Sequence, residues 1–228
     1  MKIFTFWEGK MPPYIDLCLR TWKFSFTILT YDNVNQYSEI PIEKLQRFTL
    51  PQIADYIRVH VLRDNGGYWL DADTIMITDK LPETNMIGNA TTRMNTIGFL
   101  HTEKDSDMFK SWAVFQDSVV KRFDMQNQWN MMGNAFSDKY LKEHQEISIA
   151  DVTKYWPETY IISGESRSRY DKYRQFYFEE SYSLKDIEKT DMLMLHNSWT
   201  PDWYKELPVY KILDRSVCTM SNMLRGAV

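Results

Sequence analysis

The chain has little cysteine, no long apolar run and no excess of basic residues, and each lack excludes a class of protein. Only two cysteines, Cys18 and Cys218, occur among its 228 residues, so neither a disulfide framework nor a zinc site is indicated. No window approaches the roughly 18 consecutive apolar residues of a membrane-spanning helix. The formal net charge is -4, whereas a nucleic-acid-binding domain normally carries an excess of basic residues, so we expect no nucleic-acid partner.

We also expect no secretory leader, and the sequence shows neither internal repeats nor low-complexity linkers. Its first residues, MKIFTFWEGKMPP, contain only a short apolar run, too short for the core of a signal peptide. We therefore expect a cytoplasmic protein and leave open a peripheral contact with the inner face of the cell membrane. Without a linker, one domain over residues 1–228 is expected.

Aromatic residues, in contrast, are abundant, with 8 Trp, 14 Tyr and 12 Phe making up 15% of the chain. Such side chains stack on sugars and nucleotide bases, but large cores use them as well, so composition alone favours neither role. The hydrophobic content of 43% and the charged content of 25% are ordinary for a soluble globular protein.

The start of the chain predicts a β-α-β unit. Residues 2–7 form an apolar run typical of a buried strand, and residues 14–22 carry apolar side chains at helical spacing after two prolines suited to a first helical turn. Residues 26–31 predict a second strand. A crossover helix between strands is typical of a parallel sheet, so we expect an α/β fold with a Rossmann-like mixed, mostly parallel sheet flanked by helices.

Periodicity and turn residues predict the remaining elements. Helices are expected over residues 52–64, 107–122 and 134–144, and strands over residues 68–70, 97–100, 160–163 and 192–195. The double glycine Gly66-Gly67 ends the first of these helices and leads directly into the strand at 68–70.

Two aspartates, Asp71 and Asp73, follow that strand. On a continuing strand, alternation would place both carboxylates on one face. Such a pair can hold Mg2+ or Mn2+ together with diphosphate oxygens, which points to chemistry on a sugar nucleotide. The bare motif is more often a solvated turn. However, burying two carboxylates after an apolar strand without a cation would be costly.

Asp55 and Arg58 lie three residues apart on the helix predicted over residues 52–64, and so share one side of it. One interpretation is an exposed ion pair of negligible worth. The functional interpretation is that Asp55 accepts hydrogen bonds from sugar hydroxyls while Arg58 donates to sugar or phosphate oxygens. The residues themselves leave both interpretations open.

Polar side chains also follow the apolar run at 192–195. His196 just past a strand end can ligate Mn2+, and the hydroxyl of Ser198 and the indole N–H of Trp199 are donors suited to a phosphate oxygen. A capped turn with a packed tryptophan is the alternative interpretation.

At the end of the first predicted strand, Phe6 and Trp7 offer an aromatic plane on which a nucleotide base can stack, unless they are plain core residues. Ligands of open α/β sheets bind beyond the carboxyl ends of the strands. We therefore expect Trp7, the Asp-x-Asp pair and His196 at one edge of the sheet.

The stretch RSRYDKYRQFYFEESY, residues 167–182, is basic at first and then aromatic. It fits either an exposed element with packed tyrosines or a surface that contacts an acidic membrane or a lipid phosphate.

The block ADYIRVHVLRDNGGYWLDADT resembles the signature of glycosyltransferase family 32, the "sugar-binding region containing DXD motif", and of its capsular-polysaccharide relatives. The opening KIFTFWEGKMPP and the later CLRTWK resemble the start of that family. HNSWTP resembles its His-x-x-Ser-Trp region, with a spacing one residue shorter here.

The resemblance implies a GT-A-like fold, retention of anomeric configuration, a nucleotide-diphosphate sugar donor and a Mn2+ or Mg2+ ion. It implies a nucleotide-sugar-binding half over residues 1–80, and an acceptor-side half over 81–228 that includes a C-terminal metal and diphosphate loop. By position, the resemblance implies metal binding for Asp73 and His196, and contact with ribose or sugar for Asp71, directly or through the ion. It implies donor hydroxyls for Asp55 and Arg58, the base for Trp7, and the diphosphate or glycosidic oxygen for Trp199. We expect Asp71, Asp73 and Trp199 to be catalytic, and Phe6 and Ser198 to help bind the donor.

The function implied is a bacterial hexosyltransferase of capsular or extracellular polysaccharide synthesis, with a glycan or lipid-linked saccharide as acceptor. UDP-galactose leads among the donors, ahead of other UDP-hexoses and GDP-mannose. Two alternatives remain. The run from Asp71 to Thr74 also fits the Asp-x-Asp-x-Thr of haloacid-dehalogenase-type phosphatases, in which the first Asp is a nucleophile. A non-catalytic sugar-binding domain is the other.

Overall fold

The chain forms two compact units, each assembled from three separate stretches of sequence. The computed structural model describes residues 1–122, 130–163, 167–214 and 218–228. Unit 1 comprises Met1–Glu8, Ser25–Asp71 and Glu83–Asp151, and unit 2 comprises Gly9–Phe24, Ala72–Pro82 and Val152–Val228. Any single cut in the chain would divide at least one unit, so no linker separates them. Residue 80, the expected division between the two halves, lies inside unit 2.

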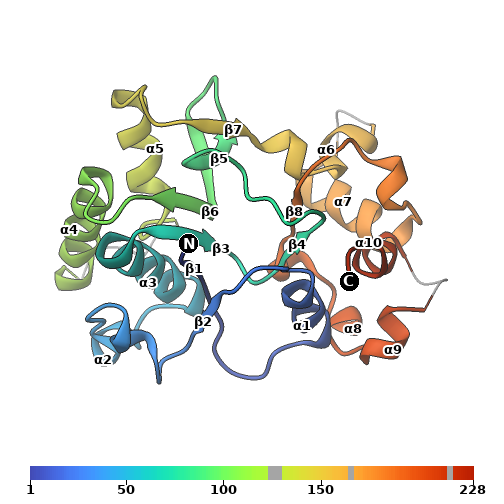
Figure 1. Cartoon of the computed structure of the whole chain (residues 1–228), viewed down its shortest axis with the longest axis horizontal. Helices are drawn as coiled ribbons and strands as arrows, with labels where there is room; N and C mark the ends of the chain where they lie inside the picture. The colour runs from blue at the N-terminus through green and yellow to red at the C-terminus, as the bar shows by residue number, and fades with distance from the viewer. Residues whose placement is uncertain (123–129, 164–166, 215–217) are drawn as a thin grey trace. The chain divides into compact units, whose positions relative to one another are not determined.

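Unit 1 is built on a mixed sheet (Figure 1). Its strands are β1 (Ile3–Phe6), β2 (Thr27–Leu29), β3 (Gly67–Leu70), β5 (Met86–Asn89), β6 (Met94–Thr102) and β7 (Ile149–Asp151). Within the described residues the order is β2-β1-β3-β6-β5-β7. β1 is parallel to β2 and β3, β5 is parallel to β7, and β6 is antiparallel to β3 and β5. Parallel pairings predominate, which confirms the predicted α/β class.

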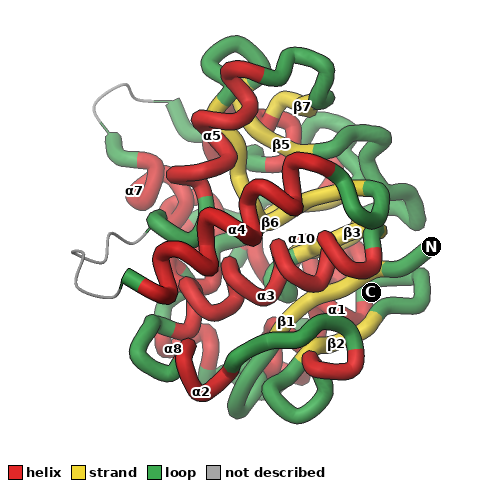
Figure 2. The backbone as a smooth tube through the Cα atoms, turned by 90° about the vertical axis from the view of Figure 1, so that its left-hand side faces the viewer, coloured by secondary structure: helices red, strands yellow, loops and turns green. Residues whose placement is uncertain are grey.

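Helices cover this sheet, and the longest of them packs directly on it. The helices of unit 1 are α2 (Ile42–Leu45), α3 (Leu50–Asn65), α4 (Asp107–Lys121) and α5 (Asn134–Glu143), with a 3-10 turn at Val34–Gln36. α3 contacts β1, β3 and β6, and α4 lies alongside α3 (Figure 2). The predicted helices at 52–64, 107–122 and 134–144 are thereby confirmed to within two residues at each end.

α3 is buried on nearly every side, and this decides where its polar residues lie. A capping box between Thr49 and Gln52 starts the helix, and Gly66, with φ of 64°, ends it. All seven residues from 56 to 62 are buried. A helix exposed along one side would turn its charged residues to solvent. α3 instead carries Asp55 and Arg58 into the interior of unit 1.

Unit 2 is mostly helical and aromatic. Its two strands, β4 (Thr74–Met76) and β8 (Met192–Met194), form an antiparallel pair. Its helices are α1 (Pro13–Arg20), α6 (Glu158–Ile161), α7 (Arg169–Arg174), α8 (Asp202–Lys205), α9 (Val209–Ile212) and α10 (Thr219–Ala227), with 3-10 turns at Val152–Tyr155, Leu184–Asp186 and Asn197–Trp199 and a π-helical turn at Gln175–Glu179. The indole of Trp22 donates to the carbonyl of Thr74 at 2.8 Å, which ties the end of α1 to β4.

Three expectations about local structure are wrong. The predicted strand at 160–163 is instead the end of α6 and the turn after it, because Pro157 starts a helix and so short an apolar run does not distinguish a strand from a buried helix. Asp71 lies outside any strand, and Ala72 and Asp73 form a turn. The two carboxylates therefore do not share a face through strand alternation.

The third expectation concerns the strand before His196. β8 pairs with β4 in a separate two-stranded sheet rather than joining the six-stranded sheet that contains β1 and β3. His196 therefore follows a strand of a different sheet from Trp7. Within the described residues, no helix is both long and apolar enough to cross a membrane.

Gly67 can be tested as a backbone constraint on the start of β3, with Gly9 as a control. Both have positive φ, 95° and 80°, so alanine at either position would cost about 1–2 kcal/mol. A Cβ at Gly67 would also lie 2.4 Å from the carbonyl oxygen of Lys2, whereas nothing lies within 4 Å at Gly9. We expect Gly67→Ala to lower the free energy of unfolding in urea clearly more than Gly9→Ala. Equal losses would contradict the account.

Candidate functional site

In unit 1, the structure brings together three of the predicted site residues. α3 places Asp55 and Arg58 one turn apart, and Asp71 follows β3. An Arg58 guanidinium nitrogen lies 3.1 Å from Oδ1 of Asp55, and another lies 3.2 Å from Oδ1 of Asp71. The side chains of Arg58 and Asp55 are only 6% and 14% exposed. The exposed-ion-pair interpretation of Asp55 and Arg58 is therefore wrong.

Further contacts fix Arg58 between the two carboxylates. Its guanidinium donates to the carbonyl of Ile97 and lies 5.1 Å from the ring centroid of Trp69. The indole of Trp69 in turn donates to Oδ1 of Asp71 at 2.9 Å. Two donors thus converge on one oxygen of Asp71. Its other oxygen accepts no hydrogen bond from the described residues, so it remains available to a ligand.

The environment of Asp55 keeps its charge poorly solvated. Burial raises the pKa of Asp55 to about 7, Arg58 opposes the rise, and Asp71 adds to it. The backbone at Gly133 lies close to the Asp55 carboxylate, because Gly133 has no side chain. A Cβ added there would lie 2.9 Å from Oδ2 of Asp55. Gln116 anchors the same turn of α3 by donating to the backbone carbonyl of Asp55 at 2.9 Å. Sequence reasoning did not identify Gly133 or Gln116.

The two aromatic residues at the end of β1 differ in accessibility. Phe6 is 8% exposed and packs against Tyr31, with ring centroids 5.7 Å apart. Trp7 is half-buried, and its indole nitrogen is buried without a hydrogen-bond partner among the described residues. Of the pair, Trp7 is therefore the one with surface for a ligand to contact.

In unit 2, hydrogen bonds tie Asp73 to the segment after β8. The backbone N–H of Asn197 donates to Oδ2 of Asp73 at 2.6 Å, and the N–H of Leu195 donates to the Asp73 carbonyl at 3.1 Å. The hydroxyl of Tyr14, on α1, donates to Oδ1 of Asn197. Burial, together with the charge of Asp73, raises the pKa of Tyr14, so this hydroxyl keeps its proton. The segment after β8, itself held by Tyr14, thus fixes the Asp73 carboxylate.

His196 is a neutral imidazole in contact with an arginine. Burial lowers its pKa to about 3, and Arg169 lowers it further. The guanidinium of Arg169 has no acceptor, so Nε2 of His196 must accept the hydrogen bond between them. No hydrogen bond within the described residues involves Nδ1. A cation bound by His196 would therefore use Nδ1 or displace Arg169 from Nε2.

Aromatic rings enclose this histidine. The ring centroid of Trp199 lies 4.1 Å from that of His196. The Tyr173 hydroxyl accepts a hydrogen bond from the His196 backbone N–H at 3.2 Å and forms another with the Thr200 hydroxyl at 3.3 Å. Ser198, between them in sequence, is exposed. His196 and Trp199 therefore form one cluster, and Ser198 lies at its surface.

The predicted metal ligands, Asp71, Asp73 and His196, offer the oxygen and nitrogen atoms that a divalent cation binds. Within the described ranges, no three His, Cys, Asp or Glu side chains form a group that could hold an ion. Asp71 and Asp73 are separated by Ala72 alone, so covalent geometry keeps their Cα atoms within about 7 Å. Carboxylates and a neutral imidazole suit Mn2+.

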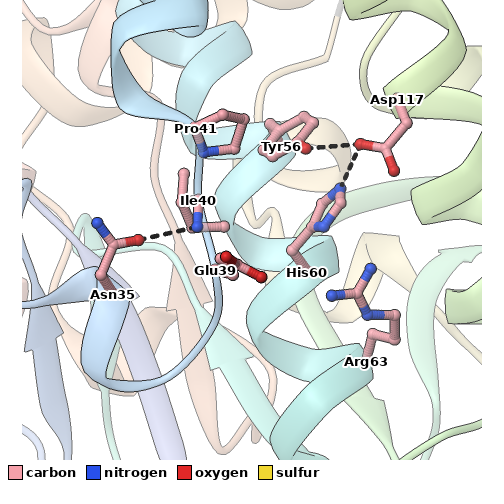
Figure 3. Close-up of a pocket in the computed structure, with 8 residues that line it drawn as sticks. All are labelled: Asn35, Glu39, Ile40, Pro41, Tyr56, His60, Arg63 and Asp117. Atoms are coloured by element: carbon pink, nitrogen blue, oxygen red, sulfur yellow. Dashed lines mark hydrogen bonds and ion pairs between the residues drawn. The ribbon is translucent and has the colours of Figure 1, made fainter.

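A separate pocket of about 690 Å³ lies in unit 1 and contains none of the predicted site residues (Figure 3). In it the rings of Tyr56 and His60 stack with centroids 3.9 Å apart, and the Tyr56 hydroxyl donates to Asp117 at 2.6 Å. Burial and Arg63 lower the pKa of His60 to about 4. This face of α3 is therefore distinct from the one that carries Asp55 and Arg58.

Comparison with known proteins relates the chain to polysaccharide synthesis. A family described as "Capsular polysaccharide synthesis protein" matches residues 1–187. The fold is similar to the PaToxG glycosyltransferase, with a TM-score of 0.44 and 15% identity over 63% of this chain and 68% of that chain. It is similar to an active-site mutant of LgtC, with a TM-score of 0.45 and 13% identity over 100% of each chain. No curated protein matches.

Removal of the Arg58 guanidinium tests whether Asp55 depends on Arg58 for its stability in the interior of unit 1. We expect Arg58→Met to lower the free energy of unfolding by about 3–5 kcal/mol, because Asp55 would be left buried and unpaired. Adding Asp55→Asn should restore part of the loss. Arg20→Met is the control, since Arg20 and Asp16 form an exposed pair worth about 0–1 kcal/mol. Urea unfolding measures all four proteins, and a loss no larger than that of the control would contradict the account.

Proposed function

The chain belongs to the family of capsular polysaccharide synthesis proteins, which confirms the predicted resemblance, and from that premise we propose a metal-dependent glycosyltransferase that transfers a hexose with retention. The donor proposed is a nucleotide-diphosphate sugar, with UDP-galactose first among UDP-hexoses. The acceptor is a glycan or a lipid-linked saccharide of capsular or extracellular polysaccharide synthesis.

One observation carries the proposal: Arg58 is buried between Asp55 and Asp71, within the sequence block that resembles the family signature. Two carboxylates joined by a buried guanidinium present fixed acceptors and donors, as recognition of sugar hydroxyls requires. In the proposed roles, Asp55 accepts hydrogen bonds from donor hydroxyls, and Arg58 orients both carboxylates. Trp7, the more accessible aromatic of the β1 end, contacts the base, with Phe6 supporting it from the core.

Asp71, Asp73 and His196 are the residues that would hold Mn2+ or Mg2+. When bound, such an ion stabilises negative charge on the departing nucleoside diphosphate. The hydrogen bond from Asn197 orients Asp73 for this role, and burial keeps His196 in the unprotonated form that ligation needs. Asp71 contributes the oxygen that Arg58 and Trp69 leave available.

Retention follows if the acceptor attacks from the face that the diphosphate leaves. The bond between the anomeric carbon and the diphosphate oxygen breaks, the acceptor oxygen bonds to the same face, and its proton passes to the departing diphosphate. The indole N–H of Trp199 and the hydroxyl of Ser198 are the proposed donors to that diphosphate, acting where negative charge develops. Such a reaction requires no nucleophilic carboxylate from the protein.

The proposed setting is the cytoplasm, with peripheral contact at the inner face of the membrane where a lipid-linked acceptor would be reached. The basic and aromatic stretch at 167–182 supports such a contact by composition. Vesicle binding would assess this part of the proposal separately from catalysis.

Donor hydrolysis tests the proposed reaction without knowledge of the acceptor. With Mn2+ present, we expect wild-type protein to release UDP slowly from at least one UDP-hexose. Asp73→Ala should reduce this rate by about a hundredfold or more, because the charge on the leaving diphosphate would lose its support. Asp202→Ala is the matched control in the same unit, since the Asp202 side chain is 93% exposed, and it should retain the wild-type rate.

The same screen separates the alternatives. Release of phosphate from monoesters, with no consumption of nucleotide sugars, would favour the phosphatase. Binding of UDP without turnover on any donor or acceptor would favour a non-catalytic sugar-binding domain. Equal hydrolysis by wild type and Asp73→Ala would remove the proposed role of Asp73.

A further inference from the structure

Arg169 presents a cation beside two residues of the candidate site. It is the first residue of α7, in unit 2. Its guanidinium carbon lies 3.2 Å from the ring centroid of Trp156 and 5.2 Å from that of Trp199, and the group donates to Nε2 of His196. Two of these three neighbours are the residues proposed above to hold the cation and the diphosphate.

Most of the hydrogen-bonding capacity of Arg169 is unused. A guanidinium has five N–H donors in one plane. Among the described residues, His196 is its one hydrogen-bond acceptor, and its Nε–H is buried without a partner. Stacking on Trp156 holds the plane by its face, so the terminal N–H groups that His196 does not use lie at its edge with no acceptor among the described residues. The side chain remains 34% exposed, so a ligand can reach those groups.

A buried carboxylate holds this cation in place without using its donors. Oε1 of Glu158 lies 3.9 Å from a terminal nitrogen of Arg169, beyond hydrogen-bond distance. The Glu158 side chain is fully buried, and neither of its oxygens has a hydrogen-bond partner among the described residues. Burial raises the pKa of Glu158 to about 7, and its ionised form attracts the guanidinium without occupying the N–H groups at its edge.

We propose that Arg169 binds the diphosphate of the nucleotide donor, an assignment that rests on the proposed function. The planar fork of a guanidinium matches two oxygens of one phosphate, which a point charge does not. Of the groups on the proposed donor, only the diphosphate is anionic. Sequence reasoning placed Arg169 in a stretch suited to lipid phosphate, and its contacts with His196 and Trp199 instead favour the donor.

Calorimetric titration with UDP and with uridine, both in Mn2+, tests the assignment. We expect Arg169→Gln to weaken UDP binding roughly ten- to a hundredfold, the usual effect of losing a hydrogen bond to a charged group. Uridine binding should not change, because uridine lacks the phosphates. A general loss of structure would weaken both ligands together.

Two further variants serve as controls. Arg174→Gln removes the same charge from the same helix, where Arg174 donates to the exposed hydroxyl of Tyr170 at 2.7 Å, and it should bind UDP as wild type does. Arg169→Lys keeps the charge and loses the fork, so it should bind UDP with intermediate affinity. It also provides a folded variant if Arg169→Gln is unstable, which thermal unfolding would reveal.

Three results would overturn the assignment. The first is equal UDP affinity in wild type, Arg169→Gln and Arg169→Lys. The second is an equal loss of UDP and uridine binding. The third is a loss of geranyl diphosphate binding with UDP binding retained, which would assign Arg169 to a lipid diphosphate instead. In each case wild type still binds UDP. If wild type fails to bind UDP in Mn2+, the proposed function fails, and this assignment fails with it.

Discussion

The buried guanidinium of Arg58 is the interaction on which the candidate site of unit 1 depends. A single planar group with five donors links Asp55 on α3 to Asp71 after β3 and also reaches the backbone of Ile97. The charge of Asp55, whose side chain is only 14% exposed, could not lie in this interior without a partner, because the cost of desolvating an unpaired charge exceeds the worth of most single contacts. The proposed recognition of a polar donor in this part of unit 1 therefore depends on the arrangement of these charges rather than on the apolar core around them.

Unit 2 fixes its polar groups in a different way. Its strands are short, and the turn that contains Asp73 is held by the backbone that follows β8 and by the hydroxyl of Tyr14. Around His196, aromatic rings exclude water and keep the imidazole neutral. Such an environment strengthens electrostatic interactions with any anion that enters it. Glycosyl transfer from a nucleotide donor needs this property, because the leaving group gains charge as the bond breaks.

Much of the fold could be predicted because its signals are local. The capping residues and glycine around α3 and the Asp-x-Asp pair are contiguous in sequence. At residues 160–163 the sequence could not distinguish the expected strand from the helix that the structure has there, because so short an apolar run fits both. The burial of α3 on nearly every side was hidden for a different reason. It depends on α4 and on β6, and no pattern within α3 reports them.

In the candidate site, too, local relationships could be predicted from the sequence, whereas contacts between distant segments could not. Asp55 and Arg58 were found because helical spacing places them together, but their burial could not be foreseen. Tyr14 and Asn197, 183 residues apart in sequence, gave no signal that they meet. Arg169 was not singled out, because it lies in the basic stretch 167–182, whose composition suggested only an exposed or membrane-contacting surface.

The most direct test of the central claim is whether UDP binding requires a divalent cation. Calorimetric titration of wild-type protein with UDP, in Mn2+ and then in excess EDTA, measures this dependence without an acceptor or a known sugar. The account predicts binding in Mn2+ and a loss of most of the affinity in EDTA, since Asp71 and Asp73 would repel the diphosphate without an ion between them. Equal affinity under both conditions would contradict it.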